Sequence, residues 1–152
     1  MTASEKLKKL GIELPSVARP LASYVPAERV GDQVWVSGQL PLVNGELPAT
    51  GKVGFDVSAE EAKELAQKAA LNALAAIDAE AGLDNITRVL KITGFVASDV
   101  NFTEQPAVIN GASDFIGEVF GEAGTHVRSA VGVAVLPKNS PVEIELVVEV
   151  AH

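Results

Sequence analysis

The chain has 152 residues, of which 47% are hydrophobic and 21% are charged, and its net charge is −8. This balance predicts one soluble globular domain with a sizeable core, and the negative charge opposes nucleic-acid binding. The absence of cysteine excludes disulfides, thiolate zinc sites and a cysteine nucleophile, and the two histidines are too few for a histidine metal cluster. No stretch approaches the roughly 18 apolar residues of a membrane span. Because the N-terminus shows no export signal, we expect a cytoplasmic protein.

The first half of the chain predicts a short helix, a strand and a long helix. Residues 1–18 form an N-terminal extension, in which MTASEKLKKLGIEL predicts a short amphipathic helix ending at Gly11. The alternation in QVWVSGQLP, residues 33–41, indicates a strand, and VNGE at 43–46 is an Asn-Gly turn signal. Ser58 and Glu61 have the spacing of a capping box, which predicts a helix from there to about Ala81.

The second half predicts a strand, a helix and two closing strands. RVLKITGFVA at 88–97 has strand character, and QPAVINGASDFIGEVFG at 105–121 predicts a helix with Pro106 in its first turn. Residues 125–150 are expected to form two strands folded back on each other. The order β-β-α-β-α-β-β predicts an α+β fold, a mainly antiparallel sheet with two helices packed on one face. The other face is left rather apolar, so we infer a homo-oligomer.

Arg128 and Glu143 are the polar residues that stand out in the two closing strands. Arg128 could simply extend from a strand end into solvent, or its planar guanidinium could bind a carboxylate or phosphate. Glu143 could be a solvated strand residue like Glu145 and Glu149, which share its face. His126 alternates with Arg128 and should face the same side of its strand, either at the surface or as a pH-dependent neighbour of a site.

Three further polar residues have both a plain and a functional interpretation. Ser37 could be an ordinary strand serine or could donate to a ligand beside Gly38, which permits close backbone approach. Asn110 would normally be an exposed helix residue. Tyr24 is the only tyrosine, and its hydroxyl could donate to a ligand or its ring could serve packing alone.

The closing segment RSAVGVAVLPKNSPVEIE resembles the signature of the RidA/YjgF family of small trimeric imine deaminases, and WVSGQLP resembles that family's serine-glycine-glutamine strand. The resemblance runs from about Arg19 to the C-terminus. It implies a homotrimer with sites between subunits, Arg128 and Glu143 on one chain and Tyr24 facing them from elsewhere. The family's functional positions correspond here to Arg128 and Glu143 as catalytic residues and to Tyr24, Ser37, Gly38, Asn110 and Ala130 as substrate-binding residues.

Two departures from the family pattern indicate a divergent branch. Ala130 stands where the family commonly has a cysteine, so a thiol role is lost, although the backbone carbonyl at that position is retained. The N-terminal extension and the loop at 47–57 are the second departure.

The resemblance implies hydrolytic deamination of 2-imino or enamine acids of the 2-aminoacrylate type, which yields 2-keto acids and ammonia. Arg128 would bind the substrate carboxylate, and Glu143 would deprotonate a water as a general base. This reaction requires no metal and no cofactor.

Three alternatives remain, two from other functional classes and one a different enzyme. The first is a trimer that binds a small carboxylate without catalysis. The second is an endoribonuclease or translation inhibitor, against which the net charge of −8 argues. The third is a chorismate-mutase-like enzyme, for whose dicarboxylate substrate one arginine is too few.

Overall fold

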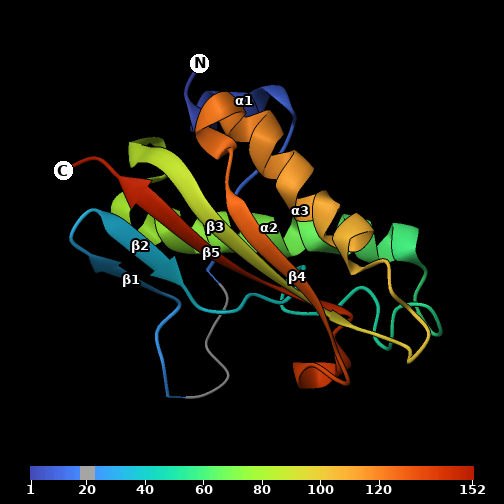
Figure 1. Ribbon diagram of the computed structural model, residues 1–152. Helices are drawn as coiled ribbons and strands as arrows, with labels where there is room; N and C mark the ends of the chain where they lie inside the picture. The colour runs from blue at the N-terminus through green and yellow to red at the C-terminus, as the bar shows by residue number, and fades with distance from the viewer. Residues whose placement is uncertain (18–22) are drawn as a thin grey trace.

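The computed structural model describes residues 1–17 and 23–152 (Figure 1). Five strands and three α-helices follow one another in these two ranges. In chain order they are α1 Ala3–Lys9, β1 Ala27–Val30, β2 Gln33–Val36, α2 Ala59–Ala81, β3 Ile86–Ala97, α3 Gln105–Phe120, β4 Val127–Val133 and β5 Val142–Val150. Short 3-10 turns occupy Leu83–Asn85, Gly121–Gly124 and Pro137–Asn139. Within the described ranges, no helix is long and apolar enough to cross a membrane.

The five strands form one sheet in the order β1-β2-β5-β3-β4. All neighbouring strands are antiparallel except β3 and β4, which run parallel. Helices α2 and α3 lie on one face of this sheet, and α1 lies beside one end of α3 (Figure 1). These features confirm the predicted α+β fold with a mainly antiparallel sheet and two helices on one face.

The predicted pairing of the two closing strands is wrong. Strand β3 lies between β4 and β5 and pairs with both. Because α3 returns the chain from the end of β3 to the start of β4, the two strands run parallel, as in a β-α-β unit. Both closing strands are apolar, so their patterns suit either a shared hairpin or separate pairing with β3, and the sequence could not distinguish these.

The hairpin in the first half also lies before the position that the turn signal suggested. Strands β1 and β2 form it, with Val30 opposite Gln33. At the Asn-Gly turn, Val43 and Glu46 make only an isolated bridge. The long loop at 47–57 lies at the far end of β3, where the Val53 amide donates to the Ala97 carbonyl at 2.7 Å.

The helix termini agree closely with the local signals. Helix α1 ends just before Gly11, whose φ of +74° suits a residue without a side chain. The Ser58 hydroxyl accepts from the Glu61 amide and caps α2, which ends at Ala81 as predicted. Helix α3 begins at Gln105 with Pro106 in its first turn.

Helix α3 is held at short range by both α2 and the sheet. A Cβ added at Gly94 on β3 would lie 2.5 Å from Ile109 of α3. A Cβ added at Gly111 of α3 would lie 1.9 Å from the Lys63 carbonyl oxygen of α2. These two glycines therefore allow α3 to sit deep between the sheet and α2, which fixes the height and rotation of the helix.

The glycines of α3 provide a matched test of this close packing. We expect Gly111→Ala to destabilise the protein by about 1–3 kcal/mol or more, because the new methyl group overlaps a backbone oxygen. At Gly117 on the same helix nothing lies within 4 Å of an added Cβ. Gly117→Ala should therefore stabilise by roughly 0.5–1 kcal/mol through helix propensity. Chemical denaturation of both variants measures the difference, and equal effects would contradict the packing argument.

Candidate functional site

The sheet directs Arg128 and Glu143 to opposite faces of the same chain. Arg128 pairs with Ile92 on β3, whereas Glu143 pairs with Phe95. Paired residues share a face and successive residues alternate, so residues three apart on β3 belong to different faces. Ile92 is fully buried under the helices, which places Arg128 on the helix-covered face and Glu143 on the open face. One chain therefore does not supply both side chains to the same pocket, contrary to the expectation from sequence.

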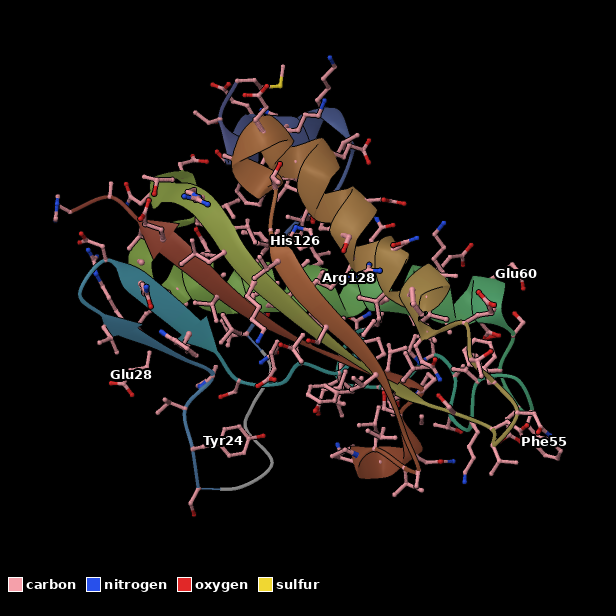
Figure 2. All side chains as sticks on the ribbon, viewed as in Figure 1. Tyr24, Glu28, Phe55, Glu60, His126 and Arg128 are labelled. Atoms are coloured by element: carbon pink, nitrogen blue, oxygen red, sulfur yellow. The ribbon has the colours of Figure 1, made fainter. Side chains whose placement is uncertain are left out.

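Arg128 is held by one side of α3. Its Nη1 donates to Asn110 Oδ1 at 2.8 Å and to Ser113 Oγ at 3.1 Å, and its Nη2 donates to the Pro106 carbonyl at 3.4 Å. Pro106, Asn110 and Ser113 follow the helical repeat and so lie on one face of α3. Figure 2 shows Arg128 on β4 beside this helix.

The contacts of Arg128 leave one edge of its guanidinium available. Both hydrogens of Nη1 are used, while Nε has no partner in the described part of the chain and Nη2 has one long contact. The ion pairs among the described residues involve only Arg29, Asp32 and His152, so none of the described carboxylates pairs with Arg128. The Nε–Nη2 edge can therefore bind a planar carboxylate through two parallel hydrogen bonds.

Glu143 lies against the backbone of Gly38 on the open face. A Cβ at position 38 would meet Cδ of Glu143 at 2.7 Å and Oε2 at 2.8 Å. The close approach that the sequence predicted at Gly38 thus serves the Glu143 side chain. Burial raises the pKa of the Glu143 carboxyl above its usual value, and the charge of Glu145 raises it further. A carboxylate with a raised pKa is a stronger base, which suits proton abstraction.

Ser37 and Tyr24 lie at the end of the β1–β2 hairpin. The Ser37 hydroxyl donates to the Val25 carbonyl at 2.5 Å, and the Ser37 amide donates to the Pro26 carbonyl at 2.8 Å. The hydroxyl proton of Ser37 is therefore used within the chain and fixes the segment that follows Tyr24. Tyr24 is 46% exposed and lies below the hairpin, away from Arg128 (Figure 2).

Asn110 and Ala130 lie with Arg128 on the helix-covered side. Asn110 is the hydrogen-bond acceptor already described, so the structure joins two of the predicted site residues. Ala130 is half-buried and pairs with Gly94, two residues beyond Arg128 on the edge strand β4. Five of the seven predicted residues thus form two groups, Arg128 with Asn110 and Ala130, and Glu143 with Gly38.

Sequence reasoning missed Ser113 and the Pro106 carbonyl as partners of Arg128. Ser113 follows Asn110 by three residues, and this spacing could have indicated a shared helix face. It also contacts His126, whose Nε2 lies 2.9 Å from Ser113 Oγ. This contact places His126 on the side of β4 that the alternation predicted.

Known proteins are similar in sequence to this chain over nearly its whole length. The family described as "YjgF/chorismate mutase-like, putative endoribonuclease" matches residues 4–150. Protein TCP17 of Trypanosoma cruzi is 44% identical over 145 residues, which cover 94% of this chain and 91% of that protein. A 2-iminobutanoate/2-iminopropanoate deaminase of Dermatophagoides farinae is 32% identical over 138 residues, which cover 90% of this chain and 93% of that protein.

Solved structures agree with the fold. A crystal structure of a protein with unknown function from Agrobacterium tumefaciens has a TM-score of 0.89 and 45% identity, covering 98% of this chain and 92% of that one. The structure of TdcF from E. coli with bound serine has a TM-score of 0.62 and 28% identity, covering 91% and 94%. The fold class is thus that of the YjgF-type proteins. This chain belongs to the YjgF/RidA family, as its two sequence motifs indicated.

Gly38→Ala tests the contact that shapes the environment of Glu143. The new methyl group would overlap the carboxylate, so we expect the side chain to move toward solvent and its pKa to fall toward the ordinary glutamate value. Carbon-13 NMR of labelled glutamate measures the titration of Glu143 in both proteins. Gly117→Ala is the matched control, and an unchanged Glu143 titration in Gly38→Ala would contradict the expected displacement.

The same variant should alter the pH dependence of stability. Between the ordinary and the raised pKa of Glu143, the folded state binds more protons than the unfolded state. The contribution of this group to stability is therefore fully present below the ordinary pKa and is lost as the pH rises through the raised one. Thermal melts across this window should show a shallower decline for Gly38→Ala than for the wild type.

Proposed function

We propose that this protein hydrolyses 2-imino acids of the 2-aminoacrylate type to 2-keto acids and ammonia. The observation that supports this most strongly is the Nε–Nη2 edge of Arg128, which has no carboxylate partner within the described chain and suits a small organic acid. Glu143, with its raised pKa, is the candidate general base. The identity with a named 2-iminobutanoate/2-iminopropanoate deaminase is consistent with this chemistry.

The active unit in this proposal is a homotrimer with its sites between subunits. Because Arg128 and Glu143 lie on opposite faces of one sheet, a complete site needs Arg128 from one copy and Glu143 from another. The open face also presents apolar side chains that a neighbouring copy would cover: Trp35 is 54%, Val127 67% and Val131 42% exposed. The open face carries the Glu143 carboxylate and the edge strand β4 carries the Arg128 guanidinium, so the charges that would meet between two copies are of opposite sign.

The proposed reaction begins with the substrate carboxylate bound side-on by Arg128, which places the C=N carbon near Glu143. Glu143 removes a proton from water as the water oxygen bonds to that carbon, and the C=N electron pair moves to nitrogen. The nitrogen takes the proton held by Glu143, which gives a tetrahedral amino alcohol and returns Glu143 to the carboxylate. Glu143 then carries the hydroxyl proton to the nitrogen as the C–N bond breaks and the C–O bond becomes a carbonyl. Ammonia leaves, and the sum is imine plus water to ketone plus ammonia.

The other predicted site residues support these two groups in the proposal. Asn110 orients the guanidinium, and Gly38 admits the Glu143 carboxylate beside the backbone. The backbone carbonyl at Ala130 accepts from the nitrogen that leaves. Ser37 fixes the segment that follows Tyr24, and the Tyr24 hydroxyl contributes to the same inter-subunit pocket.

A second candidate function is carboxylate binding without turnover. TdcF, which shares 28% identity, is described with serine bound, and serine carries the carboxylate that Arg128 would recognise. Calorimetry with serine and with 2-oxobutanoate measures binding directly. Binding that depends on Arg128, with no ammonia released from freshly generated 2-aminoacrylate, would favour this second function over hydrolysis.

Substitutions at two positions separate the proposed roles in catalysis. We expect Glu143→Gln to lower kcat by about 10²- to 10⁴-fold, the usual contribution of a general base. Arg128→Ala should lower kcat/KM by roughly 10²-fold through loss of a bidentate charged contact, and Arg128→Lys should recover only part of it. Ammonia release from 2-aminoacrylate is the measurement.

Exposed residues outside the site provide the controls for these variants. Lys68→Ala on α2 removes a positive charge and Glu118→Gln on α3 removes a negative one, and both should retain wild-type rates. If Arg128→Ala and Glu143→Gln also retained wild-type rates while folded, neither residue would have its proposed role.

Mixing two inactive variants tests whether sites lie between subunits. Oligomers assembled from equal amounts of Arg128→Ala and Glu143→Gln chains should recover about a quarter of wild-type activity. This is the fraction of subunit interfaces at which random assembly places an intact Arg128 opposite an intact Glu143. The measurement is ammonia release after joint refolding, with each variant refolded alone as the control. If no activity returns in mixed oligomers whose formation is shown by native mass spectrometry, Arg128 and Glu143 do not act together across a subunit interface.

A further inference from the structure

A chain of hydrogen bonds leads from the Arg128 guanidinium to the backbone of the turn before β4. Arg128 Nη1 donates to Ser113 Oγ at 3.1 Å, and Ser113 Oγ lies 2.9 Å from His126 Nε2. His126 Nδ1 lies 2.7 Å from the carbonyl oxygen of Gly124. All three side chains are partly buried, and Figure 2 shows Arg128 on β4 and His126 just before this strand, both beside α3.

The donor and acceptor roles in this chain follow from elementary chemistry. A carbonyl oxygen only accepts, so His126 Nδ1 must hold the hydrogen that bonds Gly124. In a neutral ring Nε2 is then an acceptor, and it receives the single hydroxyl hydrogen of Ser113. The lone pairs of Ser113 Oγ are thereby left to face Arg128. Every donor in the chain points away from the guanidinium, and such aligned bonds strengthen one another.

The far end of the chain is anchored rigidly. Gly124 is buried, and a Cβ added there would lie 2.7 Å from the carbonyl oxygen of Ile116 on α3. The turn Gly121–Gly124 thus packs directly on the C-terminal part of the helix that contributes Ser113. Because both ends of the hydrogen-bond chain belong to the same packed unit of α3 and the turn, the Ser113 hydroxyl has a defined direction.

We propose that Ser113 and His126 are positioning residues for Arg128 that hold its guanidinium with the Nε–Nη2 edge turned toward the substrate carboxylate. This inference rests on the proposed function, in which Arg128 binds that carboxylate. Ser113 takes one of the two Nη1 hydrogens and Asn110 takes the other, so the guanidinium cannot rotate without breaking two bonds. His126 acts one step further away by fixing the hydroxyl rotor of Ser113.

The same geometry argues against Ser113 as a nucleophile, although it lies beside a histidine. Its lone pairs accept from a cation, which lowers their availability for attack. The group behind the histidine is a neutral carbonyl, which does not stabilise an imidazolium as a carboxylate would.

Nitrogen-15 NMR of the histidine rings tests the chain without reference to activity. We expect neutral His126 to be the Nδ1–H tautomer, and we expect the guanidinium of Arg128 to rotate slowly in the wild type and faster in Ser113→Ala. His152 is exposed at the C-terminus and provides the reference ring in the same spectrum. An Nε2–H tautomer at His126, or equal rotation of Arg128 in both proteins, would overturn the proposal.

Kinetics of paired variants tests the consequence for substrate binding. Ser113→Ala should raise the KM for 2-aminoacrylate-derived imine about tenfold with a smaller change in kcat, because one charged hydrogen bond to the binding group is lost. His126→Gln can still accept from Ser113 and should stay near the wild-type KM. His126→Asn is too short to reach and should resemble Ser113→Ala. The double variant Ser113→Ala with His126→Asn should be no worse than either alone, because both break one chain.

The outcomes separate this inference from the proposed function. If the wild type neither binds carboxylates nor releases ammonia, the proposed function fails. The NMR result still decides whether the hydrogen bonds through Ser113 and His126 fix the orientation of the Arg128 guanidinium. If Arg128→Ala abolishes activity but Ser113→Ala and His126→Asn keep the wild-type KM, the inference fails and the proposed function stands. Variants that lower only the melting temperature, with KM unchanged, would also overturn it. Ser16→Ala and His152→Asn are the matched controls for both substitutions.

Discussion

The pairing of β3 with two neighbours determines the layout of the site. This strand is antiparallel to β5 and parallel to β4, so the alternation of its side chains fixes the faces on which both neighbours present theirs. Arg128 is aligned with Ile92 and Glu143 with Phe95. A shift of either neighbour by one residue would reverse its face, bury a carboxylate under the helices or expose the apolar set of β5. The burial of alternate residues of β5 therefore fixes its register and keeps Arg128 and Glu143 on opposite faces of the sheet.

Helix α3 provides the second constraint, because its position decides how Arg128 is held. The close approaches at Gly94 and Gly111 bring one face of α3 over the edge strand β4. That face presents the Pro106 carbonyl, Asn110 and Ser113 to the guanidinium. Neutral acceptors thus bond Arg128 on one side, and they orient its guanidinium without neutralising its charge. A positive group that is oriented and not neutralised suits the capture of an anion.

Membership of the YjgF/RidA family settles the fold more firmly than the chemistry. The relatives have different descriptions, among them a deaminase and a protein with unknown function, although they share most of this chain. A common fold hosts different activities through differences at the site. In this chain, the side chains that bond the Arg128 guanidinium are those of Asn110 and Ser113, and Ser113 in turn contacts His126.

Local spacing and motifs within single segments were enough to predict the helices, their ends, the alternation of the strands and the family. They also indicated Arg128, Glu143, Gly38 and Asn110 as candidate site residues. The three-dimensional structure was needed to show that β3 separates the two closing strands, that Arg128 and Glu143 face opposite sides, and that Ser113 links Arg128 to His126. The physical reason is that strand pairing and helix placement depend on contacts between distant segments, and two equally apolar strands show no preference in their sequences for one partner over another.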